Sequence, residues 1–323
     1  MFIQPLLNGR FKWTGMYIVF FFFVVGFLGC SHRVMNNLTD DPEILARVNF
    51  DFHTAGESYG HVDVKRDFGT LMSWGTYWPY RRVRIVQSDD LHDKVLRVRY
   101  PKNKVRFFKS GASWHWKKFN PEQEVFFSYW VLFPDSLEFR YGGKLHGLVG
   151  GKANTGGDKP NGHDGWSCRV HWGPEDLIKL YIYHKDQKGK WGDVFYFRQD
   201  PGIIRVDEET RVASREKENI KLEKGKWHHI MMRIMVNDIG QRNGLAQAWY
   251  DGKLAADIRG FEFRDNTCDA DDLLVNAMYF STFYGGRDER YKPVKDEYIL
   301  FDDFMISKSL SCPTGMTCDP IPD

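Results

Sequence analysis

Two short polar pairs stand out in an apolar part of the sequence, because their residue types could neutralise a carboxylate and move a proton. Ser167 and Arg169 lie two positions apart in "WSCRVHW". Tyr181 and Tyr183 repeat that spacing in "LIKLYIYH". Residues two apart on a β-strand face the same side of a sheet, so each pair projects together. If the two strands pair through the turn "GPED", both pairs and His171 converge on one face.

A lysine upstream adds to this group of residues. Lys144 lies in "RYGGKLHGLVGGK", where the glycines allow the backbone to approach a ligand closely. An arginine fork suits a carboxylate, and a serine can add a hydrogen bond. Lysine or tyrosine can act as a base or an acid when a neighbouring cation or burial shifts its pKa. Each residue alone has an ordinary structural explanation, so the prediction depends on the combination.

These residue types suit β-elimination from a uronic acid. That reaction needs a neutralised carboxylate, a base for the C5 proton and an acid for the departing O4. A glycoside hydrolase normally needs two carboxylates around the scissile bond. No glutamate in this sequence is followed by an aspartate two residues later, so the E-x-D-x-x-E strand of jelly-roll hydrolases is absent.

The composition argues against several other classes of partner. The 45 Lys and Arg residues nearly balance the 43 Asp and Glu residues, so no basic field for nucleic acid is expected. No paired CxxC and no HExxH occurs, and the adjacent His228 and His229 would point to opposite faces of a strand. The acidic run 265–272 is interpreted as a solvated loop, with a calcium site as the alternative. We therefore expect no metal and no cofactor.

The periodicity of the chain predicts an all-β domain over residues 45–310. Residues 94–100 and 227–237 alternate apolar and polar side chains, as half-buried strands do, and 124–133 is apolar on both faces, as a central strand is. Asp251 and Gly252 separate two short strands, which is a hairpin signal. No long amphipathic helix is predicted, so we expect a two-sheet antiparallel sandwich or jelly roll of the concanavalin-like type.

The motifs together resemble polysaccharide lyase family 14. "GGKLHGLVGG", "SCRVHW" and "YIYH" match the order and spacing of the family's pattern, and "STFYGG" (281–286) resembles a later family segment. The sequence departs from the pattern at His146, where the family has proline, and at His171, where it has an apolar residue. The resemblance implies a concanavalin-like β-jelly roll that cleaves a polyuronate of the alginate or glucuronan type and leaves unsaturated uronate ends.

The same resemblance implies roles for individual residues. It assigns acid and base duties to Lys144, Tyr181 and Tyr183, with a tyrosine as the acid and the identity of the base left open. It implies Ser167, Arg169 and Tyr284 as substrate-binding residues, and His171 is added because it continues the row of Ser167 and Arg169 on the strand. An activity optimum on the alkaline side is expected. The alternatives are a carbohydrate-binding jelly roll that does not cut, and a hydrolase; a monomer acting on an anionic polysaccharide is expected.

The first thirty residues predict export. Arg10 and Lys12 precede an apolar run that ends in "FLGC", which resembles a lipoprotein processing site with Cys30 as the lipidated residue. A cleaved signal and an uncleaved anchor are the alternatives, and all three export the chain to an extracellular, periplasmic or membrane-anchored location. Residues 31–44 are interpreted as a polar tether, and 311–323 as a tail with a local disulfide between Cys312 and Cys318. A bond between the two remaining cysteines, Cys168 and Cys268, is left open.

Overall fold

The computed structural model describes residues 43–70, 72–77, 81–88, 92–206, 218–286 and 288–323. These residues belong to one compact unit that spans 37–323. The predicted export signal at 1–30 and nearly all of the predicted tether at 31–44 lie outside the described residues. Within the described ranges, no helix has the length and apolar content that a membrane span requires.

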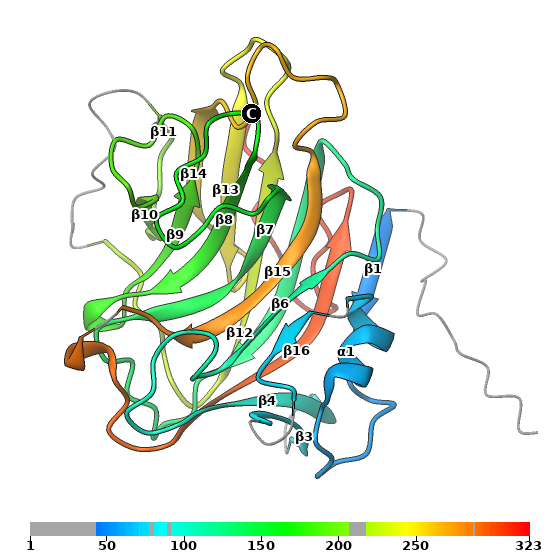
Figure 1. Cartoon of the computed structure of the whole chain (residues 1–323), viewed down its shortest axis with the longest axis vertical. Coiled ribbons are helices and arrows are strands. Elements are labelled where there is room, and N and C mark those ends of the chain that lie inside the picture. Colours follow the sequence, from blue (N-terminus) through cyan, green and yellow to red (C-terminus); the bar gives the residue numbers. More distant parts are fainter. Residues whose placement is uncertain (1–42, 71, 78–80, 89–91, 207–217, 287) are drawn as a thin grey trace, which may run out of the picture. The chain divides into compact units, whose positions relative to one another are not determined.

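Two β-sheets packed face to face make up the described part of the chain (Figure 1). The larger sheet has nine strands in the order β11-β14-β13-β12-β6-β16-β4-β3, and β1 pairs with β16. Its pairs are antiparallel, apart from the parallel pair of β11 and β14. Its strands are β1 (Ile44–Val48), β3 (Val83–Gln87), β4 (Lys94–Tyr100), β6 (Glu124–Leu132), β11 (Ile204–Arg205), β12 (Trp227–Met235), β13 (Gly244–Tyr250), β14 (Lys253–Phe261) and β16 (Glu297–Ser307).

The smaller sheet has seven antiparallel strands in the order β10-β9-β8-β7-β15-β5-β2. These strands are β2 (Ser73–Trp74), β5 (Ala112–Trp116), β7 (Gly143–Gly151), β8 (Gly165–Trp172), β9 (Ile178–Tyr183), β10 (Asp193–Tyr196) and β15 (Val275–Tyr284). The short 3-10 helix η1 (Pro174–Asp176) makes the turn between β8 and β9, and η2 (Glu289–Tyr291) follows β15. This two-sheet architecture confirms the predicted all-β jelly roll.

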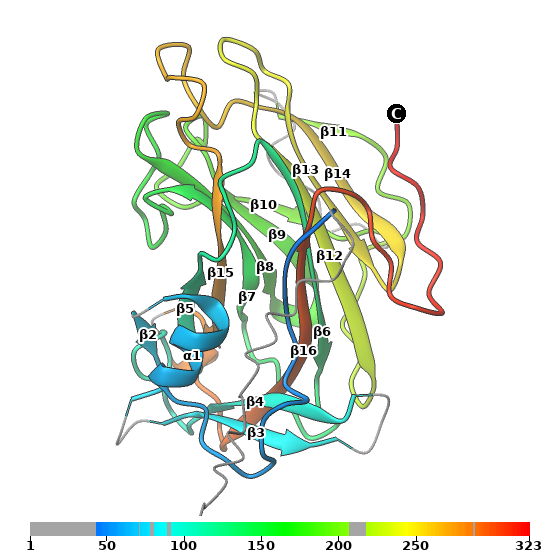
Figure 2. The same cartoon turned by 90° about the vertical axis from the view of Figure 1, so that its right-hand side faces the viewer.

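Aromatic side chains fill the space between the two sheets. Trp114 of β5 and Phe280 of β15 stack with their ring centres 3.7 Å apart. The ring of Phe304, from the opposite sheet, lies 5.7 Å from the ring of Phe280. The helix α1 (His61–Phe68) contributes Phe68, whose ring contacts Trp114 at 5.4 Å. Figure 2 shows α1 beside β2 and β5. Such dense aromatic packing supplies a rigid base for the outer face of the smaller sheet.

The structure contains the predicted strand at 94–100 and the predicted hairpin turn, and it shows which cysteines are bonded. The alternation predicted for 94–100 is that of β4, where Leu96, Val98 and Tyr100 are fully buried. Asp251 and Gly252 form the turn between β13 and β14, with positive φ angles that suit such a hairpin. Cys312 and Cys318 form a disulfide. Cys168 and Cys268 are buried thiols that are not bonded to each other.

Candidate active site

Polar side chains of β8 and β9 share the outer face of the smaller sheet, which points away from the larger sheet. Every second residue of β8 belongs to the core, which leaves Ser167, Arg169 and His171 on the outer face. The same alternation along β9 leaves Tyr181 and Tyr183 outside the core. The two strands are antiparallel neighbours, with Arg169 opposite Tyr181 and Ser167 opposite Tyr183. The structure therefore brings the two polar pairs together.

A β-bulge in β7 places Lys144 beside this group. Lys144 pairs with His171 of β8, whereas Gly147 pairs with Arg169, so β7 has one more residue than β8 between these points. An extra residue changes the face on which the following side chains lie. His146 consequently enters the aromatic core, where burial holds its pKa well below the ordinary value. The histidine that departs from the family pattern at this position is thus a core residue.

Arg169 is a buried cation without an anionic partner among the described residues. It is 3% exposed, and its Nη1 lies 3.4 Å from the hydroxyl of Ser281. Its guanidinium group lies 5.3 Å from the ring centre of Tyr279, and its Nε–H has no hydrogen-bond partner. A buried charge without a counter-ion is costly. This position therefore suits an anion that arrives from solvent.

Lys144 is a half-buried amine in the same positive neighbourhood. Burial, together with the positive charges of Arg169 and Lys179, lowers the pKa of Lys144 to about 7. Its Nζ lies 3.4 Å from Nδ1 of His171 and 5.6 Å from the ring centre of Tyr181. An amine with a pKa near neutrality is uncharged in a large fraction of molecules at pH 7, so it can accept a proton.

The pKa of Tyr181 is shifted in the opposite direction to that of Lys144. Burial raises the pKa of the Tyr181 hydroxyl, and the neighbouring hydroxyl of Tyr183, at 3.4 Å, raises it further. The Tyr181 ring stacks on the ring of His171 with a centre distance of 4.4 Å, which fixes its orientation. A tyrosine that resists ionisation keeps its proton for a departing oxygen. Lys144 and Tyr181 are therefore shifted toward base and acid roles, respectively.

Ser167 and Tyr183 hold the loop between β7 and β8. Both residues are fully buried. The Ser167 hydroxyl donates a hydrogen bond to the carbonyl of Asn154 at 2.6 Å, and the Tyr183 hydroxyl accepts one from the N–H of Gly157 at 2.9 Å. Their hydroxyl groups are thus engaged by the backbone. These contacts give Ser167 and Tyr183 a positioning role for the loop, while the carboxylate contact of Ser167 and the catalytic role of Tyr183 stay predictions.

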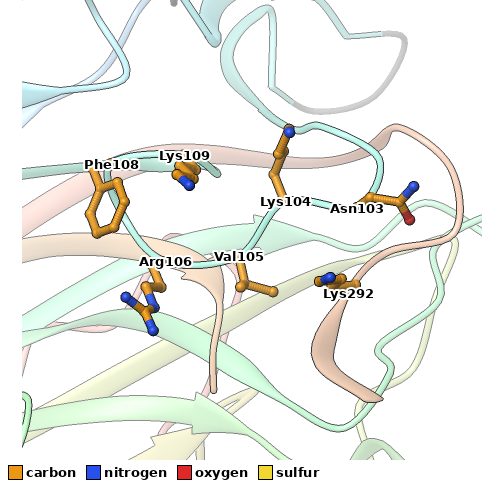
Figure 3. Close-up of a pocket in the computed structure, with 7 residues that line it drawn as sticks. All are labelled: Asn103, Lys104, Val105, Arg106, Phe108, Lys109 and Lys292. Carbon is orange, nitrogen blue, oxygen red and sulfur yellow. The ribbon is translucent and has the colours of Figure 1, made fainter. Parts of the chain in front are cut away.

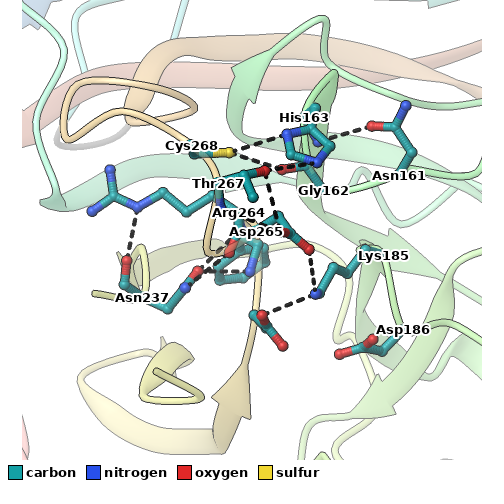
Figure 4. Close-up of polar contacts among 12 residues, drawn as sticks. Asn161, Gly162, His163, Lys185, Asp186, Asn237, Arg264, Asp265, Thr267 and Cys268 are labelled. Atoms are coloured by element: carbon teal, nitrogen blue, oxygen red, sulfur yellow. Dashed lines mark hydrogen bonds and ion pairs between the residues drawn. The ribbon is translucent and has the colours of Figure 1, made fainter. Parts of the chain in front are cut away.

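A polar network anchors the other side of that loop (Figure 4). The N–H of Asp265 donates to the carbonyl of Gly162 at 3.0 Å, and the thiol of Cys268 donates to the same oxygen at 3.2 Å. The Asp265 carboxylate accepts a hydrogen bond from Lys185 at 3.2 Å. The network joins the β7–β8 loop to the segments that follow β9 and β14. It thereby supports the loop whose backbone contacts Tyr183.

Of the two other predicted substrate ligands, Tyr284 lies in the core and His171 lies on the outer face. Tyr284 lies on the core face of β15, where it is fully buried, and its hydroxyl donates to the carbonyl of Glu138. Its prediction as a substrate ligand is therefore wrong, because the alternation along β15 turns it inward. His171 is 3% exposed, with its ring against Tyr181 and its Nδ1 beside Lys144. It contacts the candidate acid and base, and its role as a substrate ligand stays a prediction.

Three outer-face residues that the sequence analysis does not identify complete the site. His115 of β5 and Tyr279 of β15 pack with ring centres 4.6 Å apart, and Ser281 contacts Arg169. Burial, and then the charges of Lys117 and Arg169, lower the pKa of His115 to about 4. His115 is thus neutral near pH 7. A usable signal existed in "VNAMYFSTFY", where Tyr279 and Ser281 share one face of the strand.

One group of described residues could hold a metal ion, and it lies elsewhere. The possible ligand atoms of His92, Asp302 and Asp303 all lie within 4.8 Å of one another. Asp302 and Asp303 belong to β16 of the larger sheet, and Asp303 is paired with Arg47 at 2.8 Å. Asp302 lies 2.8 Å from Nδ1 of His92. This group contributes no residue to the outer face of the smaller sheet.

The fold and the site together define a class of protein. It is a two-sheet jelly roll in which a buried arginine, an amine with a lowered pKa and a tyrosine with a raised pKa lie together on one face. Such a group suits an acidic sugar and proton transfer.

The family described as polysaccharide lyase 14 matches residues 88–304. The chain belongs to this family, and the predicted polysaccharide lyase is confirmed. A variant of the alginate lyase Aly36B in complex with an alginate tetrasaccharide is 26% identical, with a TM-score of 0.65, and the match covers 83% of this chain and 98% of that one. The alginate lyase from Aplysia kurodai has the same fold, with 19% identity, a TM-score of 0.61, and coverage of 82% and 99%, respectively.

A viral relative matches a shorter part of the chain. The exolysin of Paramecium bursaria Chlorella virus 1 is 22% identical over 189 residues. That match covers 55% of this chain and only 28% of the viral protein. The shared region is therefore a fraction of the viral relative's length.

Proposed function

We propose that this lyase cleaves a polyuronate by β-elimination, with Arg169 as the carboxylate ligand, Lys144 as the base and Tyr181 as the acid. The observation that carries the proposal is the burial of Arg169 without a carboxylate partner among the described residues, beside an amine whose pKa is lowered to about 7. A uronate carboxylate supplies the missing negative charge. Its binding places the sugar against the two residues with opposite pKa shifts.

The elimination needs no reactant other than the polyuronate and the three enzyme side chains. Arg169 binds the C6 carboxylate and stabilises the negative charge that develops there when the C5 proton leaves. The neutral amine of Lys144 takes that proton and becomes an ammonium group. The C4–O4 bond then breaks as the C4=C5 double bond forms, and Tyr181 donates its proton to O4. The products are a new chain end and an unsaturated uronate.

Alginate is the first substrate to test, because the alginate lyase Aly36B is a relative that binds an alginate tetrasaccharide. The purified protein is incubated with polymannuronate, polyguluronate and glucuronan while the ultraviolet absorbance of the unsaturated uronate is followed. A rise with one of these polymers supports the proposal. Binding without any rise indicates a carbohydrate-binding protein, and new reducing ends without a rise indicate a hydrolase.

The pH dependence of activity should report Lys144. The amine is the base only when it is uncharged, and its pKa is lowered to about 7, so kcat/KM should rise with pH and level off above about pH 7. The raised pKa of Tyr181 postpones the loss of the acid to strongly alkaline pH. Initial rates at low substrate concentration, measured in buffers of constant ionic strength, test this expectation.

Removal of the amine provides the control for that profile. Lys144→Ala should lower kcat/KM by about a thousandfold and should abolish the rise near neutral pH in the residual rate. Binding of a carboxylate next to Lys144 favours its charged form, so the corresponding rise in kcat should lie at higher pH than the rise in kcat/KM. A residual rate that keeps the original pH dependence would assign the titration to another group.

The proposal also includes export of the chain and lipidation at Cys30. It is supported by the basic and apolar pattern of residues 1–30 and by the disulfide between Cys312 and Cys318, which oxidising compartments favour. In a bacterial host fed labelled palmitate, the protein should incorporate the label and Cys30→Ser should not. The matched variant Cys268→Ser should remain labelled. An unlabelled parent protein that is found in the medium would indicate a cleaved signal instead.

A further inference from the structure

A pocket with a volume of about 380 Å³ is lined mainly by the loop between β4 and β5 (Figure 3). Four of its lining residues are cations: Lys104, Arg106, Lys109 and Lys292. Lys292 is paired with Glu289, whereas the other three side chains have no carboxylate partner in the described parts of the chain. An exposed aromatic ring, Phe108, lies among them.

This pocket adjoins the Lys144 end of the candidate site. The N–H of Arg106 donates to the carbonyl of Tyr284, the last residue of β15, at 3.1 Å. Gly285 follows directly, and a Cβ atom placed on it would lie only 2.8 Å from Nζ of Lys144. The loop also contacts the outer face of β15, because Phe107 packs against Phe283 with ring centres 6.1 Å apart. Tyr284 and Gly285 thus lie between the pocket and the candidate base, since the first contacts Arg106 and the second lies beside Lys144.

A polyuronate carries one carboxylate on every sugar, so a chain held at Arg169 presents further negative charges beyond it. Exposed cations attract such charges through the solvent, and the attraction weakens as salt screens it. Phe108 is 39% exposed, with Nζ of Lys109 over its ring at 5.8 Å from the ring centre, so an aromatic surface for a sugar ring and a cation for its carboxylate lie side by side. The pocket therefore combines the two features that recognise an acidic polysaccharide.

We infer that this basic pocket is a distal subsite that binds the carboxylates of uronate residues beyond the sugar that is cleaved. The inference rests on the proposed function and extends it to the length of the substrate. Lys104, Arg106 and Lys109 act there as carboxylate ligands, with Phe108 beneath a sugar ring. Cleavage of a long chain then depends on the pocket more strongly than cleavage of a short oligosaccharide.

The test removes the charge of the pocket and compares long with short substrates. A triple variant, Lys104→Ser with Arg106→Ser and Lys109→Ser, is compared with a control that loses three charges elsewhere, Lys65→Ser with Lys221→Ser and Lys226→Ser. On the polymer, the pocket variant should lose about tenfold in kcat/KM through KM, and the control should lose less than about twofold. On a trisaccharide, the difference between the two variants should disappear. Equal kcat/KM values on the polymer would overturn the inference.

A binding measurement separates this inference from the proposed reaction. Affinity electrophoresis in gels that contain alginate should retard the unsubstituted protein and the control more than the pocket variant, and added salt should reduce that difference. This readout needs no turnover, so it tests the pocket even if no polyuronate is cleaved. Inorganic phosphate is added in parallel gels. Equal retardation of all three proteins, or binding of phosphate to the pocket without binding of alginate, would contradict a polysaccharide subsite.

Discussion

Replacing Arg169 with alanine is expected to lower kcat/KM on the preferred polyuronate by about a thousandfold or more. Arg169 is the buried cation that is proposed to bind the carboxylate, and its Nη1 contacts only the neutral hydroxyl of Ser281 among the hydrogen-bond partners within the described residues. Without it, the charge that develops on the carboxylate as the C5 proton leaves has no fixed partner. Initial rates from the absorbance of the unsaturated product measure the loss.

The stability of Arg169 variants distinguishes a functional arginine from a structural one. Arg169→Met keeps most of the side-chain volume and removes a buried charge whose Nε–H has no partner. Such a replacement is expected to leave the melting temperature unchanged or to raise it, while activity is still lost. Arg169→Lys, which keeps the charge without the planar fork, should retain more activity than either variant. A clear drop in melting temperature for Arg169→Met would indicate a structural role.

The sequence predicts the strands that have one apolar face. In β4 and in β8 the alternation of side chains decides which residues enter the core, so the outward projection of Arg169 follows from the pattern. The antiparallel pairing of β8 with β9 follows from the short turn between them. These two facts are sufficient to bring Arg169 and Tyr181 together. This part of the site could therefore be predicted without coordinates.

The bulge in β7 could not be predicted from alternation. It depends on Gly147, where a Cβ atom would lie 2.0 Å from the carbonyl oxygen of Cys168 on the neighbouring strand. Only glycine permits that approach, and the approach becomes visible only when the partner strand is present. A regular strand would put His146 on the same face as Lys144. The structure puts it in the core.

The error at Tyr284 has a different cause. β15 is a central strand with aromatic residues on both faces, so alternation alone does not tell which face is the core. Tyr279 and Tyr284 therefore look equivalent in the sequence. The hydroxyl partners of Ser167 and Tyr183 also could not be predicted, because they are backbone groups of a loop whose path depends on tertiary contacts.

Replacing Tyr181 with phenylalanine removes one oxygen atom from the site and is expected to lower kcat by about a thousandfold. The hydroxyl is the proposed acid for O4, and its raised pKa keeps the proton in place at the working pH. The phenylalanine ring can still stack on His171, so substrate affinity and melting temperature should change little. Initial rates at saturating substrate, together with thermal unfolding, measure these expectations.

Tyr183→Phe is the matched control, because it removes the same atom from the neighbouring tyrosine. Tyr183 is fully buried, and its hydroxyl accepts a hydrogen bond from the N–H of Gly157 rather than facing substrate. Its loss should destabilise the loop by about 1 kcal/mol and should lower kcat by only about tenfold, through less exact positioning of Tyr181. Since the two hydroxyls lie 3.4 Å apart, a proton could also be supplied by the pair. Equal losses of kcat in the two variants would show that the pair acts as one acid, and would contradict the assignment of that role to Tyr181 alone.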